Sequence, residues 1–320
     1  MKKLLLSLFL LLSCSAFAAD PFMVIHPFRE TFLHFPSPTL NKEGLVVTVF
    51  LPETSIPLTQ KYPVVYALGL GPQQAQEIKK LQDSYDQKAL IVGISLGENE
   101  NATLEQISTF LSRELVPYIG VNYLTQDEPS SRALVVMGPQ RAELAVHLMQ
   151  KKDLFGRLGC SHCGDRAFSL EGASHNARIL LVGRRSEVLP WQEMLEKMSY
   201  PYGAGFVTKI LPDPIVEDAI DLDYFFAKDE TVRVKKLAGA LYPKKISLKE
   251  GKGFLNLSAV LQNGAVFDYI PLSVRMSPPY LDWNAESGVL SPISGAEAGK
   301  VKLGVSVDKV KFNAKIHLKK

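Results

Sequence analysis

Residues 132–164, RALVVMGPQRAELAVHLMQKKDLFGRLGCSHCG, decide how the chain folds. The apolar run 133–137 predicts a buried strand, and the spacing of apolar residues over 141–151 predicts a helix. The short segment 138–142 between them predicts a tight turn. A strand that passes through such a turn directly into a helix is the setting of the nucleophile elbow, G-x-S-x-G, which presents a catalytic serine. The setting is present here, but Gln140 stands where the serine would be.

Four further phrases surround this turn in a fixed order along the chain. They are KYPVVYAL (61–68), LIVGI (90–94), FLSRELVPYI (110–119) and KDLFGRL (152–158). Together they resemble the esterase-type α/β-hydrolases, the secreted esterase family that includes feruloyl-esterase-like and enterochelin-esterase-like proteins. The resemblance covers residues 37–227. It implies an α/β-hydrolase-like, mostly parallel sheet flanked by helices.

The resemblance also places the three catalytic positions of such an enzyme. An acyl-transfer hydrolase needs a nucleophile, a histidine that takes its proton and an acid that orients the histidine. Besides Gln140 at the nucleophile position, Ser186 stands at the acid position, in the phrase GRRSE. Asp213 lies in the LPDPI phrase, where the family has its histidine, and no histidine occurs between His175 and His317. We therefore expect no working triad.

Two glycines follow the strand predicted over 62–68. The family often has His-Gly-Gly there, and this chain has Gly69-Leu70-Gly71. Gly69 and Gly71 are the candidates for an oxyanion loop that offers backbone N–H groups. A tight turn that needs glycine explains them equally well.

The pattern of elements supports this fold up to about residue 231. Apolar runs predict strands over 44–52, 62–68, 89–94, 177–182 and 206–211, and helical spacing predicts helices over 74–88, 103–119, 191–198 and 218–227. Strands that alternate with helices are typical of right-handed βαβ units on a parallel sheet. We expect this α/β-hydrolase-like domain to occupy residues 20–232.

Short alternating strands take over in residues 233–320. We predict them over 245–248, 254–261, 266–271, 301–307 and 309–318, with the lysines of the last strand on one face and its apolar residues on the other. LDWN (281–284) and AGKVKL (298–303) resemble segments of bacterial Ig-like domains, which implies a small all-β Ig-like sandwich. The row of lysines has two interpretations. It is either a solvated face that prevents the edge strand from pairing with another chain, or a surface that binds an acidic polymer.

The amino terminus predicts export. Lys2 and Lys3 precede an apolar run over 4–12, and AFA at 16–18 reads as a cleavage site, so we expect a signal peptide over 1–19. Lipid attachment at Cys14 is the alternative. We expect a periplasmic or extracellular protein with no transmembrane segment after cleavage. The formal net charge of +3 falls to about +1 without the two lysines, and this excludes nucleic acid as the expected partner.

Two cysteines remain after cleavage, Cys160 and Cys163. In an oxidising compartment such a pair predicts a structural disulfide. A redox C-x-x-C site in which His162 lowers a thiol pKa is the alternative, and zinc is disfavoured because the spacing is crowded. We expect no metal and no cofactor.

These expectations leave two main functions. The first is an exported, esterase-like protein that has lost its catalytic activity and acts as a binding or scaffold module for a glycan, an envelope component or a protein partner. The second is an active carboxylic-ester hydrolase with a non-standard catalytic site. The sequence favours the first, since three positions depart from the family's pattern at once.

Overall fold

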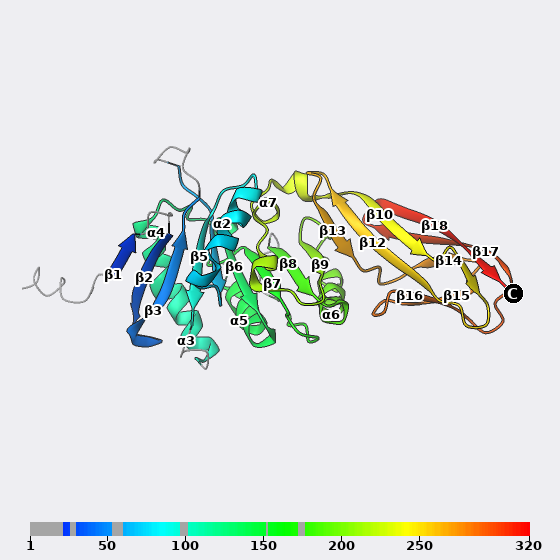
Figure 1. Cartoon of the computed structure of the whole chain (residues 1–320), viewed down its shortest axis with the longest axis horizontal. Helices are drawn as coiled ribbons and strands as arrows, with labels where there is room; N and C mark the ends of the chain where they lie inside the picture. Colours follow the sequence, from blue (N-terminus) through cyan, green and yellow to red (C-terminus); the bar gives the residue numbers. More distant parts are fainter. Residues whose placement is uncertain (1–21, 26–29, 53–59, 97–101, 152, 172–176) are drawn as a thin grey trace, which may run out of the picture.

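The computed structural model describes residues 22–25, 30–52, 60–96, 102–151, 153–171 and 177–320. The molecule is elongated, with an α/β part followed by a β-rich part that ends at the carboxyl terminus (Figure 1). The expected signal peptide over 1–19 and Cys14 lie outside the described residues. No described helix is both long and apolar enough to cross a membrane.

The described residues of the α/β part form nine strands. They are β1 (Phe22–Ile25), β2 (Glu30–Ser37), β3 (Asn41–Phe50), β4 (Val64–Leu68), β5 (Leu90–Ser95), β6 (Arg132–Met137), β7 (Arg157–Ser161), β8 (Arg178–Gly183) and β9 (Phe206–Ile210). Its helices are η1 (Pro72–Gln74), α2 (Ala75–Ser84), α3 (Leu104–Thr109), η3 (Phe110–Leu115), α4 (Val116–Asn122), η4 (Pro129–Ser131), α5 (Pro139–Gln150), α6 (Arg185–Lys197), η5 (Val216–Ala219), α7 (Leu222–Phe225) and η6 (Asp229–Val232).

The main sheet is mixed. Its strand order is β1-β2-β3-β5-β4-β6-β7-β8-β9, and it continues through β13, β12, β16 and β15. The six strands from β5 to β9 run parallel to one another. β1, β2 and β3 pair antiparallel, as do the strands beyond β9. The expected α/β architecture is confirmed, but "mostly parallel" is wrong for the sheet as a whole, because hairpin strands extend it at both ends.

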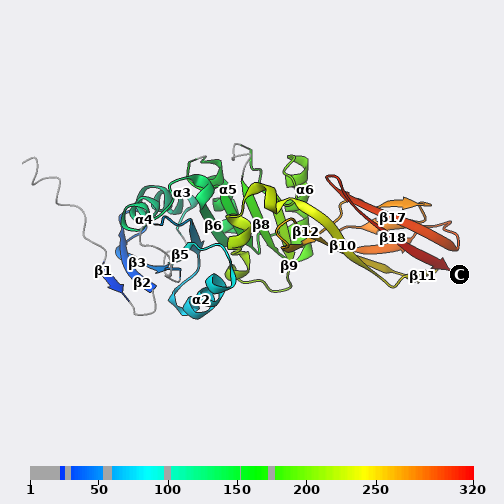
Figure 2. The same ribbon diagram turned by 90° about the horizontal axis from the view of Figure 1, so that it is seen from above.

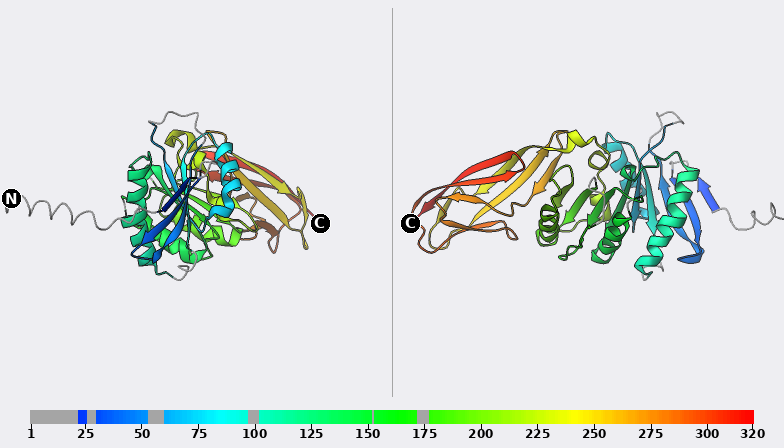
Figure 3. Two further views of the ribbon diagram at one scale, coloured as in Figure 1. Left: turned by 60° about the vertical axis from the view of Figure 1, so that its left-hand side comes forward. Right: turned by 180° about the vertical axis from the view of Figure 1, so that it is seen from behind.

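The central strands are buried on both faces, as expected for parallel strands covered by helices. Every residue of β4 and of β8 is buried. Figure 2 shows α3, α4, α5 and α6 along one face of the sheet and α2 on the other. The views in Figure 3 agree that helices flank these strands on both sides.

The helix predicted over 103–119 is one continuous helical path with a π-helical turn in its middle. Thr103 caps its start, since the Thr103 hydroxyl accepts a hydrogen bond from the Gln106 N–H. The π-helical turn spans η3 (Phe110–Leu115), before α4 continues to Asn122. Such turns inside a helix occur frequently at functional sites.

Two predicted helices needed correction. The helix expected over 218–227 is broken into η5 and α7, because the Asp221 side chain accepts a hydrogen bond from the Tyr224 N–H and starts a new helix there. The helix expected over 191–198 begins earlier, at Arg185, where Glu187 caps its first turn.

The β-rich part consists of two sheets. Its strands are β10 (Val234–Tyr242), β11 (Lys245–Ser247), β12 (Gly253–Leu261), β13 (Val266–Tyr269), β14 (Arg275–Ser277), β15 (Leu281–Asn284), β16 (Val289–Pro292), β17 (Gly299–Val307) and β18 (Val310–Lys319). β11, β18, β17 and β14 form a separate four-stranded sheet. The predicted alternation of β18 is confirmed, since its lysines are exposed while Ile316 and Leu318 are buried. Gly253 of β12 lies directly against Ile316 of β18, so the two sheets share a core.

The two parts are joined through β9 and β13. Thr208 of β9 pairs with Asp268 of β13. The Ile210 N–H donates to Asp268 Oδ2 at 2.8 Å. The Arg185 Nε donates to the Ala285 carbonyl at 2.6 Å. This junction makes the β-rich part continuous with the main sheet.

Candidate functional site

The turn between β6 and α5 has the expected strand–turn–helix form, but the residue with the left-handed backbone is a glycine. Gly138 has φ +91°, a conformation that glycine adopts without a steric penalty. Its N–H donates to the Ser161 carbonyl at 2.9 Å, which ties the turn to the neighbouring strand β7. In a nucleophile elbow the strained residue is the nucleophile itself. Gln140 instead lies exposed in the first turn of α5, and it is not among the described non-glycine residues with positive φ.

Arg141, the next residue, covers the turn after β4. Its Nη1 lies 2.8 Å from the position that a Cβ on Gly69 would take, and Gly69 has φ +92°. The Gly69 N–H donates to the Ile94 carbonyl at 2.9 Å. The Gly71 N–H donates to Gln74 Oε1 at 2.9 Å. Both oxyanion-loop candidates therefore use their N–H groups within the protein in this structure.

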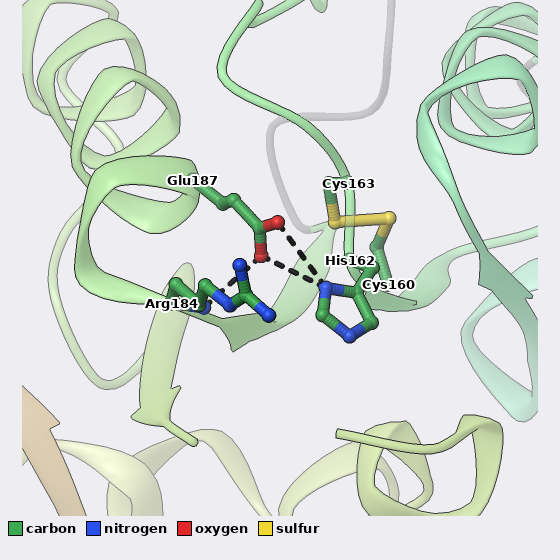
Figure 4. The surroundings of a disulfide bond; sticks show 5 residues. All are labelled: Cys160, His162, Cys163, Arg184 and Glu187. Atoms are coloured by element: carbon green, nitrogen blue, oxygen red, sulfur yellow. Dashed lines mark hydrogen bonds and ion pairs between the residues drawn. A yellow bond between two sulfur atoms is a disulfide. The ribbon is translucent and has the colours of Figure 1, made fainter. Parts of the chain in front are cut away.

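An imidazole and a carboxylate meet at the carboxyl ends of β7 and β8 (Figure 4). His162 Nδ1 lies 3.1 Å from Glu187 Oε2 and 3.2 Å from Glu187 Oε1. Their side chains are 24% and 21% exposed. Glu187 also accepts a hydrogen bond from the Arg184 N–H at 3.0 Å, so the first turn of α6 fixes its position. With Nδ1 donating to Glu187, a neutral His162 would keep Nε2 as a proton acceptor.

The backbone of His162 is held as firmly as its side chain. The residue has φ +51°, and its N–H donates to the Val182 carbonyl at 2.9 Å. Cys160 and Cys163 form a disulfide around it, which confirms the predicted pairing. Both cysteines are almost fully buried, at 1% and 4% exposure. Access of an external thiol to this disulfide is thus restricted in the folded chain.

The two remaining triad positions lie nearby without forming a triad. Ser186 is exposed on the first turn of α6 and lines an open pocket of about 550 Å³ with Arg184, Glu187, Glu193 and Glu286. Asp213 is bound by Arg184, whose Nη2 lies 3.2 Å from Asp213 Oδ1. Among the described residues, no hydroxyl or thiol is hydrogen-bonded to the His162 imidazole.

Ser161, next to His162 in the sequence, also lacks access to a substrate. Its side chain is fully buried, and its Oγ is sealed from solvent. No group of three or more potential metal ligands occurs in the described ranges. The site therefore offers an imidazole–carboxylate pair beside a polar pocket.

Sequence reasoning missed the pairing of His162 with Glu187. One signal was available, because each residue follows a strand and the carboxyl ends of neighbouring parallel strands lie at one edge of a sheet. Glu187 stands one residue after the acid position of the family's pattern, and His162 lies between the two cysteines, so neither residue occupies a position that the resemblance marks as catalytic.

No protein-family model and no curated protein matches the chain. Several solved structures resemble it at low identity. An uncharacterised protein from Capnocytophaga ochracea is 16% identical, with a TM-score of 0.44, over 62% of each chain. A ferulic acid esterase from Anaeromyces mucronatus is 14% identical, with a TM-score of 0.41, over 64% of this chain and 89% of the esterase. An enterochelin esterase from Shigella flexneri is 15% identical, with a TM-score of 0.44, over 61% of this chain and 57% of the esterase. The chain thus spans less than two thirds of the Capnocytophaga protein and of the enterochelin esterase. Likeness at this level assigns no activity.

Proposed function

We propose that the chain is an exported, esterase-like protein without hydrolytic activity, which acts as a binding or scaffold module at the cell envelope. The observation that carries the proposal is the local structure at Gln140. An amide side chain on an unstrained, exposed helical residue is neither a nucleophile nor a base near neutral pH. The imidazole at this edge of the sheet pairs with Glu187 and has no described hydroxyl or thiol bonded to it.

The surroundings of the His162–Glu187 pair favour ligand binding over catalysis. The Gly69 and Gly71 N–H groups are engaged within the protein, so neither is free to stabilise an oxyanion in this conformation. Exposed polar groups from α6 and from the β-rich part line the adjacent pocket of about 550 Å³. A glycan, another envelope component or a protein partner is the proposed ligand class.

We further propose that residues 233–320 are an Ig-like domain that serves as a spacer or adhesion unit. The support is the presence of two sheets that share one core, together with the alternation along β18. Domains of this shape act in many unrelated roles, so this part of the proposal rests on fold-level analogy.

The direct test uses a fluorophosphonate probe, which forms a covalent bond with an activated serine. Residues 20–320 would be incubated with the probe beside an active serine esterase as the positive control. We expect no labelling of this chain. Stoichiometric labelling that is lost in Ser186→Ala would assign a nucleophile and overturn the proposal.

The His162–Glu187 pair favours a second candidate function, hydrolysis of carboxylic esters by a non-standard site. In that case His162 would act as a general base on a bound water, and Glu187 would orient the imidazole. Such an enzyme would hydrolyse aryl esters without reacting with the fluorophosphonate. Loss of this turnover in His162→Gln would establish the second function.

A further inference from the structure

A second pocket lies at the opposite end of the strands from His162. It has a volume of about 640 Å³ and opens beside Val64 and Arg132, which are the first residues of β4 and β6. The π-helical turn and α4 form one side of it through Ser112, Val116 and Gly120. This volume lies within the range of small-molecule sites.

Two hydroxyl groups line this pocket without a partner. Tyr66 is only 1% exposed and Thr125 only 5% exposed, yet neither hydroxyl makes a hydrogen bond among the described residues. Neither oxygen is sealed from solvent. Each hydroxyl can therefore donate a hydrogen bond to water or to a molecule bound in the pocket.

Arg132 supplies a fixed positive charge at the same place. Its Nη2 donates to the Asp127 and Asp153 carbonyls, each at 2.9 Å, so the guanidinium is anchored by backbone oxygens. Within the described ranges no carboxylate lies within ion-pair distance of it, and its Nη1 makes no hydrogen bond. Burial raises the pKa of Tyr66, and the charge of Arg132 opposes that rise only in part. Tyr66 is thus a protonated donor near neutral pH.

The other charged side chains of the pocket do not neutralise the positive charge of Arg132. The Asp127 carboxylate is paired with Lys61 at 3.2 Å. Asp153 is exposed to solvent, which screens its charge. Lys151 also lines the pocket and donates to Ser108 Oγ at 2.7 Å, but it is exposed, so solvent screens its charge in the same way. Hydrogen-bond donors therefore predominate at the buried end of the pocket.

The outer walls are apolar. Val64, Val116 and Leu154 line the pocket and are buried, while Val121 is 84% exposed and extends the apolar surface to the solvent. An apolar wall with a few convergent polar groups is typical of a site for a small organic molecule. The distribution matches a ligand with an anionic head and an apolar body.

We infer that this pocket binds a small organic acid, with its carboxylate at Tyr66, Thr125 and Arg132 and its apolar body along Val116 and Val121. A carboxylate accepts several hydrogen bonds at once, and a guanidinium matches its geometry. The inference goes beyond the proposed function, because the pocket shares no residue with the edge of the sheet that carries His162.

Isothermal titration with octanoate tests the inference, with 1-octanol and octylamine as probes that share the chain and differ in the head group. We expect saturable binding of octanoate and at least tenfold weaker binding of the other two. Tyr66→Phe removes only the unpartnered hydroxyl and should weaken octanoate binding about tenfold, the size expected for a hydrogen bond to a charged group.

Tyr224→Phe is the matched control. The Tyr224 hydroxyl also has no described hydrogen-bond partner, but it is sealed from solvent and Tyr224 does not line the pocket. The Tyr224→Phe variant should bind octanoate with the same affinity as the parent chain. Gly120→Met places a long side chain at the pocket wall on an exposed helical position and should abolish binding, while thermal unfolding shows that the variant is folded.

Three outcomes would overturn the inference. The first is no saturable binding of octanoate up to about 1 mM, an affinity at which a specific site would contribute little. The second is equal affinity for octanoate and 1-octanol. The third is an octanoate affinity that is the same in Tyr66→Phe, Gly120→Met and the parent chain.

Discussion

Glu187 Oε2 lies 3.1 Å from His162 Nδ1 and, at the same time, 3.0 Å from the backbone nitrogen of Arg184. One carboxylate thus caps helix α6 and orients an imidazole that projects from the neighbouring strand. The same contact therefore connects the first turn of α6 to His162, the side chain at this edge of the sheet that is best placed to act as a base. Changes at Glu187 should therefore affect both stability and the orientation of His162.

We predict that Glu187→Ala lowers the free energy of unfolding by about 1–2 kcal/mol, because it removes a helix cap and the bond to His162. Glu187→Gln keeps an oxygen that can accept the Arg184 N–H and should lose less than half as much. Urea unfolding of both variants measures the difference. Glu193→Ala, on the same helix, is the control and should behave like the parent chain. A Glu187→Ala variant as stable as the parent would show that the cap contributes nothing.

The buried disulfide yields a second prediction. Replacing Cys160 and Cys163 together by alanine should cost about 2 kcal/mol, as the chain-entropy estimate for a very short loop suggests. Because both cysteines are almost fully buried, dithiothreitol should reduce the native bond at a rate that rises steeply with urea. Thiol alkylation followed by mass spectrometry reports the reduced fraction. Fast reduction that is independent of urea would instead support thiol–disulfide exchange as a function.

Glu196 should make stability depend on pH. Burial raises its pKa above the ordinary value of 4.5, while its hydrogen bond from Gln192 lowers the pKa and the charge of Glu193 raises it further. A raised carboxyl pKa means that the folded state holds the proton more tightly than the unfolded state. The resulting stability is present below pH 4.5 and is lost as the pH rises through the folded pKa.

Glu196→Gln removes this titration and should flatten the pH profile of the thermal unfolding midpoint between pH 4 and pH 7. At pH 7 the variant should be at least as stable as the parent. A Glu196→Gln variant with the same pH profile as the parent would rule Glu196 out as its source.

Asp268 connects the two parts of the molecule. Its Oδ2 accepts the Ile210 N–H at 2.8 Å, next to the only described backbone pair between β9 and β13. We predict that Asp268→Ala costs about 1.5–3 kcal/mol, the range for a lost hydrogen bond to a charged group. Calorimetry should show the two parts unfolding at better separated temperatures than in the parent chain. A single, unshifted transition would show that the junction depends on other contacts.

Much of the fold could be predicted from local sequence. The central strands are continuous apolar runs, and such runs are what strands covered on both faces require, so β4, β5, β6 and β8 were located to within about two residues. β10 was missed, because Gly239 and two alanines weaken its apolar pattern and a register shift near Val234 interrupts its pairing with β12. Alternation along β18, by contrast, was unambiguous.

The candidate site was less predictable. The turn at Gly138 and the Cys160–Cys163 bond depend on residues that are close in sequence, and both were predicted. The His162–Glu187 pair depends on a separation of 25 residues and on the left-handed backbone of a histidine. Few non-glycine residues adopt that conformation, so no local pattern predicts it. The antiparallel edge strands likewise follow from pairings that the local pattern does not specify.

Steady-state hydrolysis of 4-nitrophenyl acetate and butyrate by residues 20–320, measured beside the His162→Gln variant, tests the central claim most directly. The claim is that this edge of the sheet binds and does not catalyse. It predicts a slow background rate that is the same for the parent chain and the variant. A rate that saturates with ester concentration in the parent and falls by a factor of about 100 or more in His162→Gln would contradict it.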